Sequence, residues 1–225
     1  MPFPSPLSER RTPMNRIGIL GSGRVATVLA TRLATAGHDV MIGTRNVAGT
    51  SAKWTGPAVT FAAPPQTARE ASLIINATPG DTSLERLAAL REVLDGKILV
   101  DVSNATRRGA EGLPAGLSYP DSSLAEHLQH ALPGTRVVKT LNTMLFSVMV
   151  NPRGLTHPPT AFLSGNDEGA KATVRQLLHD LGWPPEWIED LGDISTARGA
   201  EALILLVPHL LRGRGFAPFA LTVAR

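Results

Sequence analysis

Three small residues stand at the spacing G-x-G-x-x-A near the start of the chain: Gly21, Gly23 and Ala26. They lie in the stretch RIGILGSGRVATVLATRLATAGHDVMIGTRN, residues 16–46. In this pattern the first glycine permits a tight turn and the second lets the backbone approach a pyrophosphate at a helix N-terminus. The third small residue lets the helix lie close to the sheet. A glycine-rich turn without a ligand is the simpler alternative, but a setting between a strand and a helix favours nucleotide binding.

The end of the second strand distinguishes two dinucleotides. NAD sites usually carry an acidic residue there, about twenty residues beyond the glycines, which binds the ribose hydroxyls. This chain has Thr44, Arg45 and Asn46 instead. Arg45 has a planar fork suited to a phosphate, Thr44 has a hydroxyl group, and no carboxylate is placed to repel the charge. These residues favour NADP(H), the alternative being an exposed arginine at a helix start.

The elements that must position these residues alternate between strand and helix, which predicts an α/β fold with a Rossmann-type doubly wound parallel sheet. Helical spacing of apolar residues after the glycine turn ends at Gly37, a natural helix stop. Strands are expected at 16–21, 38–43, 58–62, 72–78, 97–103, 136–141, 160–165 and 187–192, and further helices at 81–96, 122–132, 167–182 and 193–215. Pro208 should bend or break the last of these helices.

Composition divides the chain and narrows its class. We expect residues 1–13, rich in Pro and Ser, to be a disordered tail, 14–145 to form an NADP-binding Rossmann domain, and 146–225 to form a small C-terminal α/β region. The chain has no Cys, which excludes disulfides and thiolate sites. A net charge of +3 and scattered Arg residues argue against a nucleic-acid surface. The N-terminus lacks the apolar run of a secretory signal, so we expect a cytoplasmic protein.

Several motifs together resemble the NADPH-dependent coenzyme F-420 reductase family, the small deazaflavin:NADP oxidoreductases and their bacterial relatives. The resemblance runs from about Arg16 to near the end of the chain. The motifs that carry it are GILGSGRVATVLATRLATAGHDVMIGTRN, INATPGDTS, LVDVSNA, VVKTLNTM, FLSGNDEGAK and DLGDISTARGAE. The first is shared with many Rossmann proteins, whereas GTRN, KTLNTM and SGND together are more specific. The resemblance implies NADP(H) as cofactor and coenzyme F-420, a deazaflavin, as co-substrate. It also implies that the small C-terminal region, 146–225, closes the cleft of the Rossmann domain.

The resemblance also implies a set of cofactor-binding residues. The glycine turn would hold the pyrophosphate, Thr44 and Arg45 the 2′-phosphate, and residues 77–79 the adenosine and ribose side. Residues 142–144 would line the nicotinamide, and archaeal members carry a His where this chain has Asn142. The complete set is Gly21, Ser22, Gly23, Arg24, Val25, Thr44, Arg45, Asn46, Ala77, Thr78, Pro79, Ser103, Asn104, Asn142, Thr143 and Met144. Turn chemistry would account equally well for Ser103 and Asn104.

We identify no catalytic side chain and no metal ligands in the sequence. The His residues lack partner spacing, and the only Tyr, Tyr119, has no Lys nearby. Asp190, Arg198 and Glu201 match the family pattern, but capping and ion pairing would explain them. Hydride transfer between a nicotinamide and a deazaflavin is the chemistry of the cofactors themselves, and the protein supplies alignment and a dry cleft.

Three functions remain open at this stage: a reductase of a deazaflavin or another planar acceptor, an imine or ketone reductase of related architecture, and an NADP-binding sensor without turnover. A reductase requires a second pocket opposite the nicotinamide, built by residues 144–150 and the C-terminal segment GFAPFALTVAR. The face of AEALILLVPHLL is too apolar for an exposed helix. We therefore expect it to pack on the Rossmann domain or on a second subunit, as a homodimer.

Overall fold

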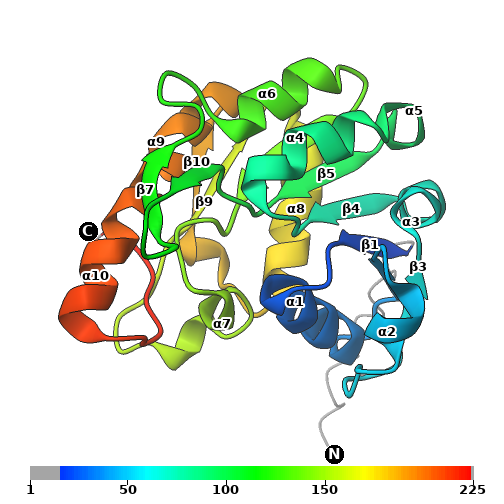
Figure 1. The fold of residues 1–225 in the computed structure, drawn as a ribbon, viewed down its shortest axis with the longest axis horizontal. Helices are drawn as coiled ribbons and strands as arrows, with labels where there is room; N and C mark the ends of the chain where they lie inside the picture. The colour runs from blue at the N-terminus through cyan, green and yellow to red at the C-terminus, as the bar shows by residue number, and fades with distance from the viewer. Residues whose placement is uncertain (1–15, 224–225) are drawn as a thin grey trace, which may run out of the picture.

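The computed structural model describes residues 16–223, so the tail expected at residues 1–13 lies outside the described residues. An eight-stranded sheet forms its centre (Figure 1), in the order β10-β9-β8-β5-β4-β1-β2-β3. Its strands are β1 (Ile17–Leu20), β2 (Val40–Gly43), β3 (Thr60–Ala62), β4 (Leu73–Asn76), β5 (Ile98–Asp101), β8 (Arg136–Thr140), β9 (Ala161–Gly165) and β10 (Ile188–Gly192). All eight were expected from the sequence. Neighbouring strands run parallel except β8 and β9, which are antiparallel.

Helices cover both faces of this sheet and bury two apolar clusters. They are α1 (Arg24–Thr35), α2 (Val47–Ser51), α3 (Pro64–Glu70), α4 (Gly80–Ala88), α5 (Arg91–Leu94), α6 (Leu124–Ala131), α7 (Phe146–Met149), α8 (Glu168–Asp180), α9 (Ala197–Ala202) and α10 (Val207–Arg214), with short 3-10 turns η1 (Pro152–Gly154), η2 (Pro185–Trp187), η3 (Ile194–Thr196) and η4 (Leu203–Leu206). Consecutive residues of a strand face opposite clusters, as Ile74 and Ile75 do. Because helices cover both faces of the sheet, side chains on both sides of each central strand are buried, and these strands are continuous apolar runs in the sequence.

The region after residue 145 extends the same sheet. Strand β9 pairs with β8, and β10 pairs with β9. The C-terminal segment then returns to the start of that region, where Leu145 N donates to Phe219 O (2.9 Å) and Met144 and Ala220 form an antiparallel bridge. The boundary expected near residue 145 thus coincides with a reversal of strand direction, from β8 to β9, within one sheet.

Three local features differ from the sequence-based expectations. The helix expected over 81–96 is two helices, because Leu90 leaves the helical conformation (φ −106°, ψ 10°) before Leu94 turns into the core. A hairpin of β6 (Thr106–Arg108) and β7 (Pro114–Leu117), whose sequences lack alternation, was not expected. The last helix is interrupted at η4, ahead of Pro208, which takes a first-turn position of α10 where its missing N–H costs no hydrogen bond.

The apolar face expected to be buried is only partly covered within one chain. Leu205 and Leu206 are 36% and 46% exposed, whereas Leu203, Ile204 and Val207 are half-buried. By length and a mean hydropathy of 1.3, one helical run among the described residues, Ile194–Gly213, could cross a membrane, which by itself is weak evidence. The homodimer through this helix stays a prediction.

Candidate functional site

The turn after β1 has the backbone that its glycines suggest. Gly21 adopts φ +120°, a region that residues with a side chain rarely enter, and its N–H donates to Gly43 O at 3.0 Å. A Cβ atom at Gly21 would lie 2.5 Å from the carbonyl oxygen of Ala77. Because the turn lies directly against the end of β4, only glycine fits at this position.

Gly23 is constrained differently. It is the N-cap of α1 with an ordinary extended backbone (φ −85°, ψ −172°), and apart from its chain neighbours no described residue lies within 4 Å of a Cβ added there. The first turn of α1, wholly within the described residues, carries no acidic side chain. Ala26, the third small residue, is fully buried against the sheet. An open approach, free N–H groups and a positive helix end fit a pyrophosphate group.

The residues after β2 lie beside this turn. Thr44 is 6% exposed, and its Oγ1 lies 3.3 Å from Ser22 Oγ and 3.1 Å from Thr50 Oγ1. Asn46 caps α2, since its Oδ1 accepts from Gly49 N at 2.9 Å. Arg45 between them is exposed and makes no ion pair with a described carboxylate. Its guanidinium is therefore available to an anion at the end of β2.

The end of β4 is organised by a buried amide. Asn76 is fully buried; its Nδ2 donates to Ser103 Oγ (3.2 Å) and Asp101 Oδ1 (2.8 Å), and its Oδ1 accepts from Thr78 Oγ1 (2.6 Å). The loop that follows, with Ala77, Thr78 and Pro79, is thereby fixed to the end of β5. We did not identify Asn76 from the sequence, although a polar residue inside the apolar run SLIINAT is the signal that could have found it.

Two loops meet at the ends of β5 and β8. Asn104 Nδ2 donates to Asn142 O (2.8 Å), and Asn142 Nδ2 donates back to Asn104 Oδ1 (3.0 Å). Leu141 just before this pair adopts φ +59°, the only positive φ of a non-glycine residue among those described. Such strained backbone persists where surrounding contacts fix it, and it often marks a functional site.

Two polar atoms in these loops lack partners. Asn142 is 4% exposed and Thr143 is 6% exposed, yet Asn142 Oδ1 and Thr143 Oγ1 have no hydrogen-bond partner among the described residues. A buried polar atom without a partner is costly unless a ligand or water supplies one. Both residues line a pocket, and both belong to the segment expected to contact the nicotinamide.

This pocket, of about 330 Å³, lies between the strand ends and the C-terminal part of the chain. Residues 144–149 and the segment after residue 215 both contribute to it, as the reductase hypothesis requires. Its lining is Val25, Thr78, Gly80, Val102, Ser103, Asn104, Asn142, Thr143, Met144, Leu145, Phe146, Met149, Leu203, Ile204, Leu206, Val207, Leu210, Leu211, Phe216, Phe219 and Leu221. None of these lining residues carries an acidic, basic or phenolic side chain. The pocket is thus mainly apolar, and the loops at the strand ends contribute its amide and hydroxyl groups.

Arg24 connects the glycine turn to the wall of this pocket. Its guanidinium lies over the ring of Phe146 at 5.4 Å and over that of Phe216 at 6.0 Å, measured to the ring centroids. Phe216 is otherwise 65% exposed. The start of α1 therefore contacts α7 and the C-terminal segment through cation–π interactions.

Three buried charges lie behind the strand ends. Lys139 Nζ is 2.8 Å from Asp101 Oδ2 and 2.8 Å from Glu201 Oε1, and it also donates to Ser103 O. Burial alone would lower the pKa of Lys139, but the attraction of the two carboxylates outweighs it and holds that pKa above its usual value. Sequence reasoning left Asp101 and Lys139 out, although a charged residue in each of the apolar strands KILVDVS and RVVKTL was the available signal.

The three family-matching charged residues have the structural contacts expected. Arg198 forms a two-pronged ion pair with Glu126, which lowers the pKa of that carboxyl. Asp190 accepts from Lys171 and Arg175. Glu201 accepts from the backbone N–H groups that open α6.

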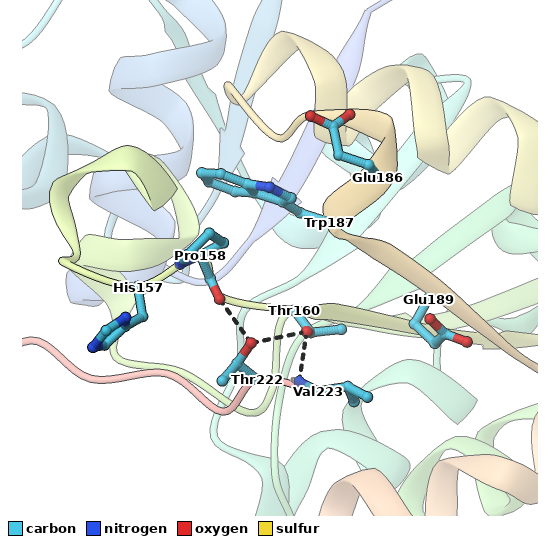
Figure 2. Close-up of a pocket in the computed structure, with 8 residues that line it drawn as sticks. All are labelled: His157, Pro158, Thr160, Glu186, Trp187, Glu189, Thr222 and Val223. Atoms are coloured by element: carbon cyan, nitrogen blue, oxygen red, sulfur yellow. Dashed lines mark hydrogen bonds between the residues drawn. The ribbon is translucent and has the colours of Figure 1, made fainter. Parts of the chain in front are cut away.

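A second cavity, of about 410 Å³, lies elsewhere and contains none of the predicted cofactor residues (Figure 2). Its hydroxyl groups bond within the chain: Thr222 Oγ1 donates to Pro158 O (2.7 Å), and Val223 N donates to Thr160 Oγ1 (3.0 Å). Glu186 and Glu189 come from different elements, and no cluster of metal-binding side chains occurs among the residues described. We therefore assign no function to this cavity.

The structure brings the predicted cofactor residues to one edge of the sheet, at the carboxyl ends of β2, β1, β4, β5 and β8. Seven of them line the pocket: Val25, Thr78, Ser103, Asn104, Asn142, Thr143 and Met144. The others, which form the glycine turn and the ends of β2 and β4, lie outside its lining. This order along the edge matches an extended dinucleotide with one end at β2 and the other at β8.

Known proteins resemble this chain over most of its length. The family described as NADP oxidoreductase, coenzyme F420-dependent, matches residues 16–105. A solved structure from Arthrobacter sp. FB24, named provisionally as an F420-dependent NADP reductase, is 41% identical, with a TM-score of 0.85 over 94% of this chain and 100% of its own. The F420-dependent NADP reductase of Methanocaldococcus jannaschii is 28% identical over 62% of both chains.

A longer relative is the metalloreductase STEAP3 of Rattus norvegicus, 33% identical over 88% of this chain. This chain spans only 38% of the length of that relative. The glycine turn, the arginine at the end of β2 and the similarity over 94% of the chain to the Arthrobacter structure agree. The chain belongs to the coenzyme F420-dependent NADP oxidoreductase family, a family of NADP-dependent oxidoreductases with a Rossmann-type fold.

Proposed function

We propose that the protein is a reductase in which hydride passes from NADPH to a planar acceptor, coenzyme F-420 or a ring system of similar shape, held in the apolar pocket. The observation that carries the proposal is that pocket: about 330 Å³ in volume, it adjoins Asn142 and Thr143, and its described lining contains no titratable side chain. When bound, NADPH supplies the hydride, and the protein supplies position and a dry environment.

The chain's own residues divide the binding task. The turn at Gly21, Ser22 and Gly23 and the start of α1 would hold the pyrophosphate, and Arg45 with Thr44 would hold the 2′-phosphate. The unpartnered Asn142 Oδ1 and Thr143 Oγ1 would hydrogen-bond the polar substituents of a ring at the pocket's inner end. The apolar side chains of α7, η4 and α10 that line the pocket would limit the access of water to a bound ring.

The lining also ranks the acceptors. A ketone becomes an alkoxide when it accepts hydride and needs a proton donor beside its oxygen, which no titratable lining residue provides. A deazaflavin spreads the added charge over its ring, and an iminium ion becomes neutral. The pocket therefore supports the planar acceptor first and an iminium second, and its open volume is an argument against a sensor without turnover.

The experiment measures oxidation of NADPH and of NADH by the purified chain, with and without oxidised coenzyme F-420. We expect turnover that requires both NADPH and the deazaflavin. Arg45→Asp should lower the affinity for NADPH by about 10- to 100-fold, since a charge-assisted hydrogen bond contributes about 1.5–3 kcal/mol, and should abolish the preference over NADH. Arg91→Asp, at an exposed position of α5, is the matched control and should leave both unchanged.

Tight NADPH binding without reduction of the deazaflavin would contradict the acceptor assignment, and a screen of cyclic iminium ions would follow. Equal use of NADH by the wild-type chain would contradict the role of Arg45.

A further inference from the structure

The buried ion cluster joins the strand ends to the C-terminal helices. The side chains of Lys139, Asp101 and Glu201 are 1%, 0% and 5% exposed, and they come from β8, β5 and α9. The Lys139 ammonium group is thus shared by the carboxylates of Asp101 and Glu201, which lie 100 residues apart in the sequence. Removing one member of such a buried cluster leaves an uncompensated charge, so its geometry is strongly constrained.

The Asp101 side of the cluster belongs to the strand ends. Asp101 Oδ1 accepts from Ser103 Oγ (2.7 Å) and from Asn76 Nδ2 (2.8 Å). Ser103 lines the pocket, and Lys139 holds the backbone oxygen of the same residue. This side fixes the inner end of the pocket.

The Glu201 side belongs to the opposite wall. Glu201 Oε2 accepts from Leu124 N (2.9 Å) and Oε1 accepts from Ala125 N (3.2 Å), so the carboxylate also caps the start of α6. The residues that follow it, from Leu203 to Leu211, supply six of the pocket's lining side chains: Leu203, Ile204, Leu206, Val207, Leu210 and Leu211.

The other attachments of this wall are mostly exposed. The η4 turn packs against β7, and Arg212 of α10 forms an exposed ion pair with Glu111 (3.0 Å). Across residues 202–212, all in the described part of the chain, Pro208 alone is buried. An ion pair between Arg198 and Glu126 also joins α9 to α6, but Arg198 is 55% exposed, and exposed pairs contribute little. Glu201 is therefore the buried charged residue nearest to the wall along the chain. In Figure 1, α9 and α10 follow one another along one edge of the molecule.

We infer that Glu201 is a positioning residue for the acceptor pocket: its carboxylate, held by Lys139 and by the start of α6, sets the distance between the wall at residues 203–211 and the strand ends at Ser103 and Asn142. Glu201 is not among the lining residues of the pocket, and its described partners are Lys139 and the backbone of α6, so it acts through the wall. The inference rests on the proposed function only for the KM measurement, because hydrogen exchange needs no turnover.

The test compares Glu201→Gln with Arg198→Gln, which removes a charge from the same helix but from its exposed pair. Amide hydrogen exchange of the full chain should become faster across residues 203–211 in Glu201→Gln and stay unchanged in Arg198→Gln. With coenzyme F-420 as acceptor, Glu201→Gln should raise the acceptor KM about tenfold, equivalent to about 1.4 kcal/mol. The Kd of NADPH should stay within about twofold.

Glu201→Asp keeps the charge but withdraws the carboxylate by one methylene, and it serves if Glu201→Gln does not fold. Its acceptor KM should rise less, with the same separation from NADPH binding. Unchanged exchange at residues 203–211 would overturn the inference, and so would a loss of protection throughout the chain with KM, kcat and NADPH affinity changing together. Failure of the wild-type chain to reduce coenzyme F-420 would contradict the proposed function alone, because the exchange comparison still decides the role of Glu201.

Discussion

The two ends of the site are built in opposite ways. The proposed dinucleotide end, at β1 and β2, comes from one continuous stretch and uses backbone geometry: a glycine with φ +120°, an open helix N-terminus and an exposed arginine. The proposed acceptor end, at β5 and β8, is assembled from segments near residues 78, 103, 143, 207 and 219. It depends on side-chain packing and on a buried ion cluster behind it.

This difference suggests how each end can vary. A binding site formed by one continuous stretch changes only if residues of that stretch change. A pocket whose walls come from distant segments can be reshaped by substitutions on α10 or in the C-terminal segment while the cofactor end stays the same. We therefore expect members of one such family to share a cofactor and to differ in acceptor.

The largest effect should come from the glycine that the fold itself requires. Gly21→Ala forces a side chain into a region of backbone conformation reserved for glycine and places Cβ against Ala77 O. The free energy of unfolding should fall by about 3 kcal/mol or more. Thermal and chemical denaturation would measure this loss.

Gly23→Ala is the matched comparison in the same turn. Its backbone is accessible to alanine and the added Cβ meets open space, so stability should fall by less than about 1 kcal/mol. NADPH affinity, measured by titration, should nevertheless fall by about tenfold or more, since the methyl group takes the space of the pyrophosphate. Equal losses of stability in the two variants would mean that the glycines serve the fold alone.

A smaller effect, confined to the acceptor end, should follow from filling the pocket. Leu210→Trp places a larger ring in the lining, so the acceptor KM should rise about tenfold while NADPH affinity changes by less than about twofold. Leu205→Trp, on the same helical wall but 36% exposed and outside the lining, is its control. Parallel loss of NADPH affinity in Leu210→Trp would show that the two ends are not separate.

The smallest effect concerns the charge at Glu201. Burial raises the pKa of Tyr119, and the Glu201 carboxylate raises it further because a phenolate beside it would be a second negative charge. Glu201→Gln should therefore lower the pKa of Tyr119 without bringing it fully back to its usual value. Tyr119 is the only tyrosine of the chain, so its ultraviolet absorbance reports this titration directly. An unchanged titration would contradict an effect of the Glu201 side chain on Tyr119.

The same division explains what the sequence could predict. The strands and the dinucleotide end follow from local patterns, because turn chemistry and apolar periodicity act over a few residues. Arg45 was identified for the same reason: it follows a recognisable strand at a fixed distance from the glycines.

The acceptor end was only outlined. Lys139, Asp101 and Glu201 meet through tertiary contacts between segments far apart in the chain. The charges of Lys139 and Asp101 stand out within apolar strands, but the sequence does not show that they meet each other and Glu201. The interruption at η4 and the strain at Leu141 depend on packing as well. Sequence patterns do not record which distant side chains share a cavity, so these residues required the structure.

The most direct test of the account uses NADPH labelled with deuterium on one face of the nicotinamide C4. After one turnover with oxidised coenzyme F-420, mass spectrometry would follow the label. We predict that deuterium from one of the two faces passes fully to the reduced deazaflavin and that label from the other face stays on the nicotinamide, because the pocket lies on one side of the predicted ring position. Oxidation of NADPH with the label lost to water, or passed from both faces, would contradict direct hydride transfer in this pocket.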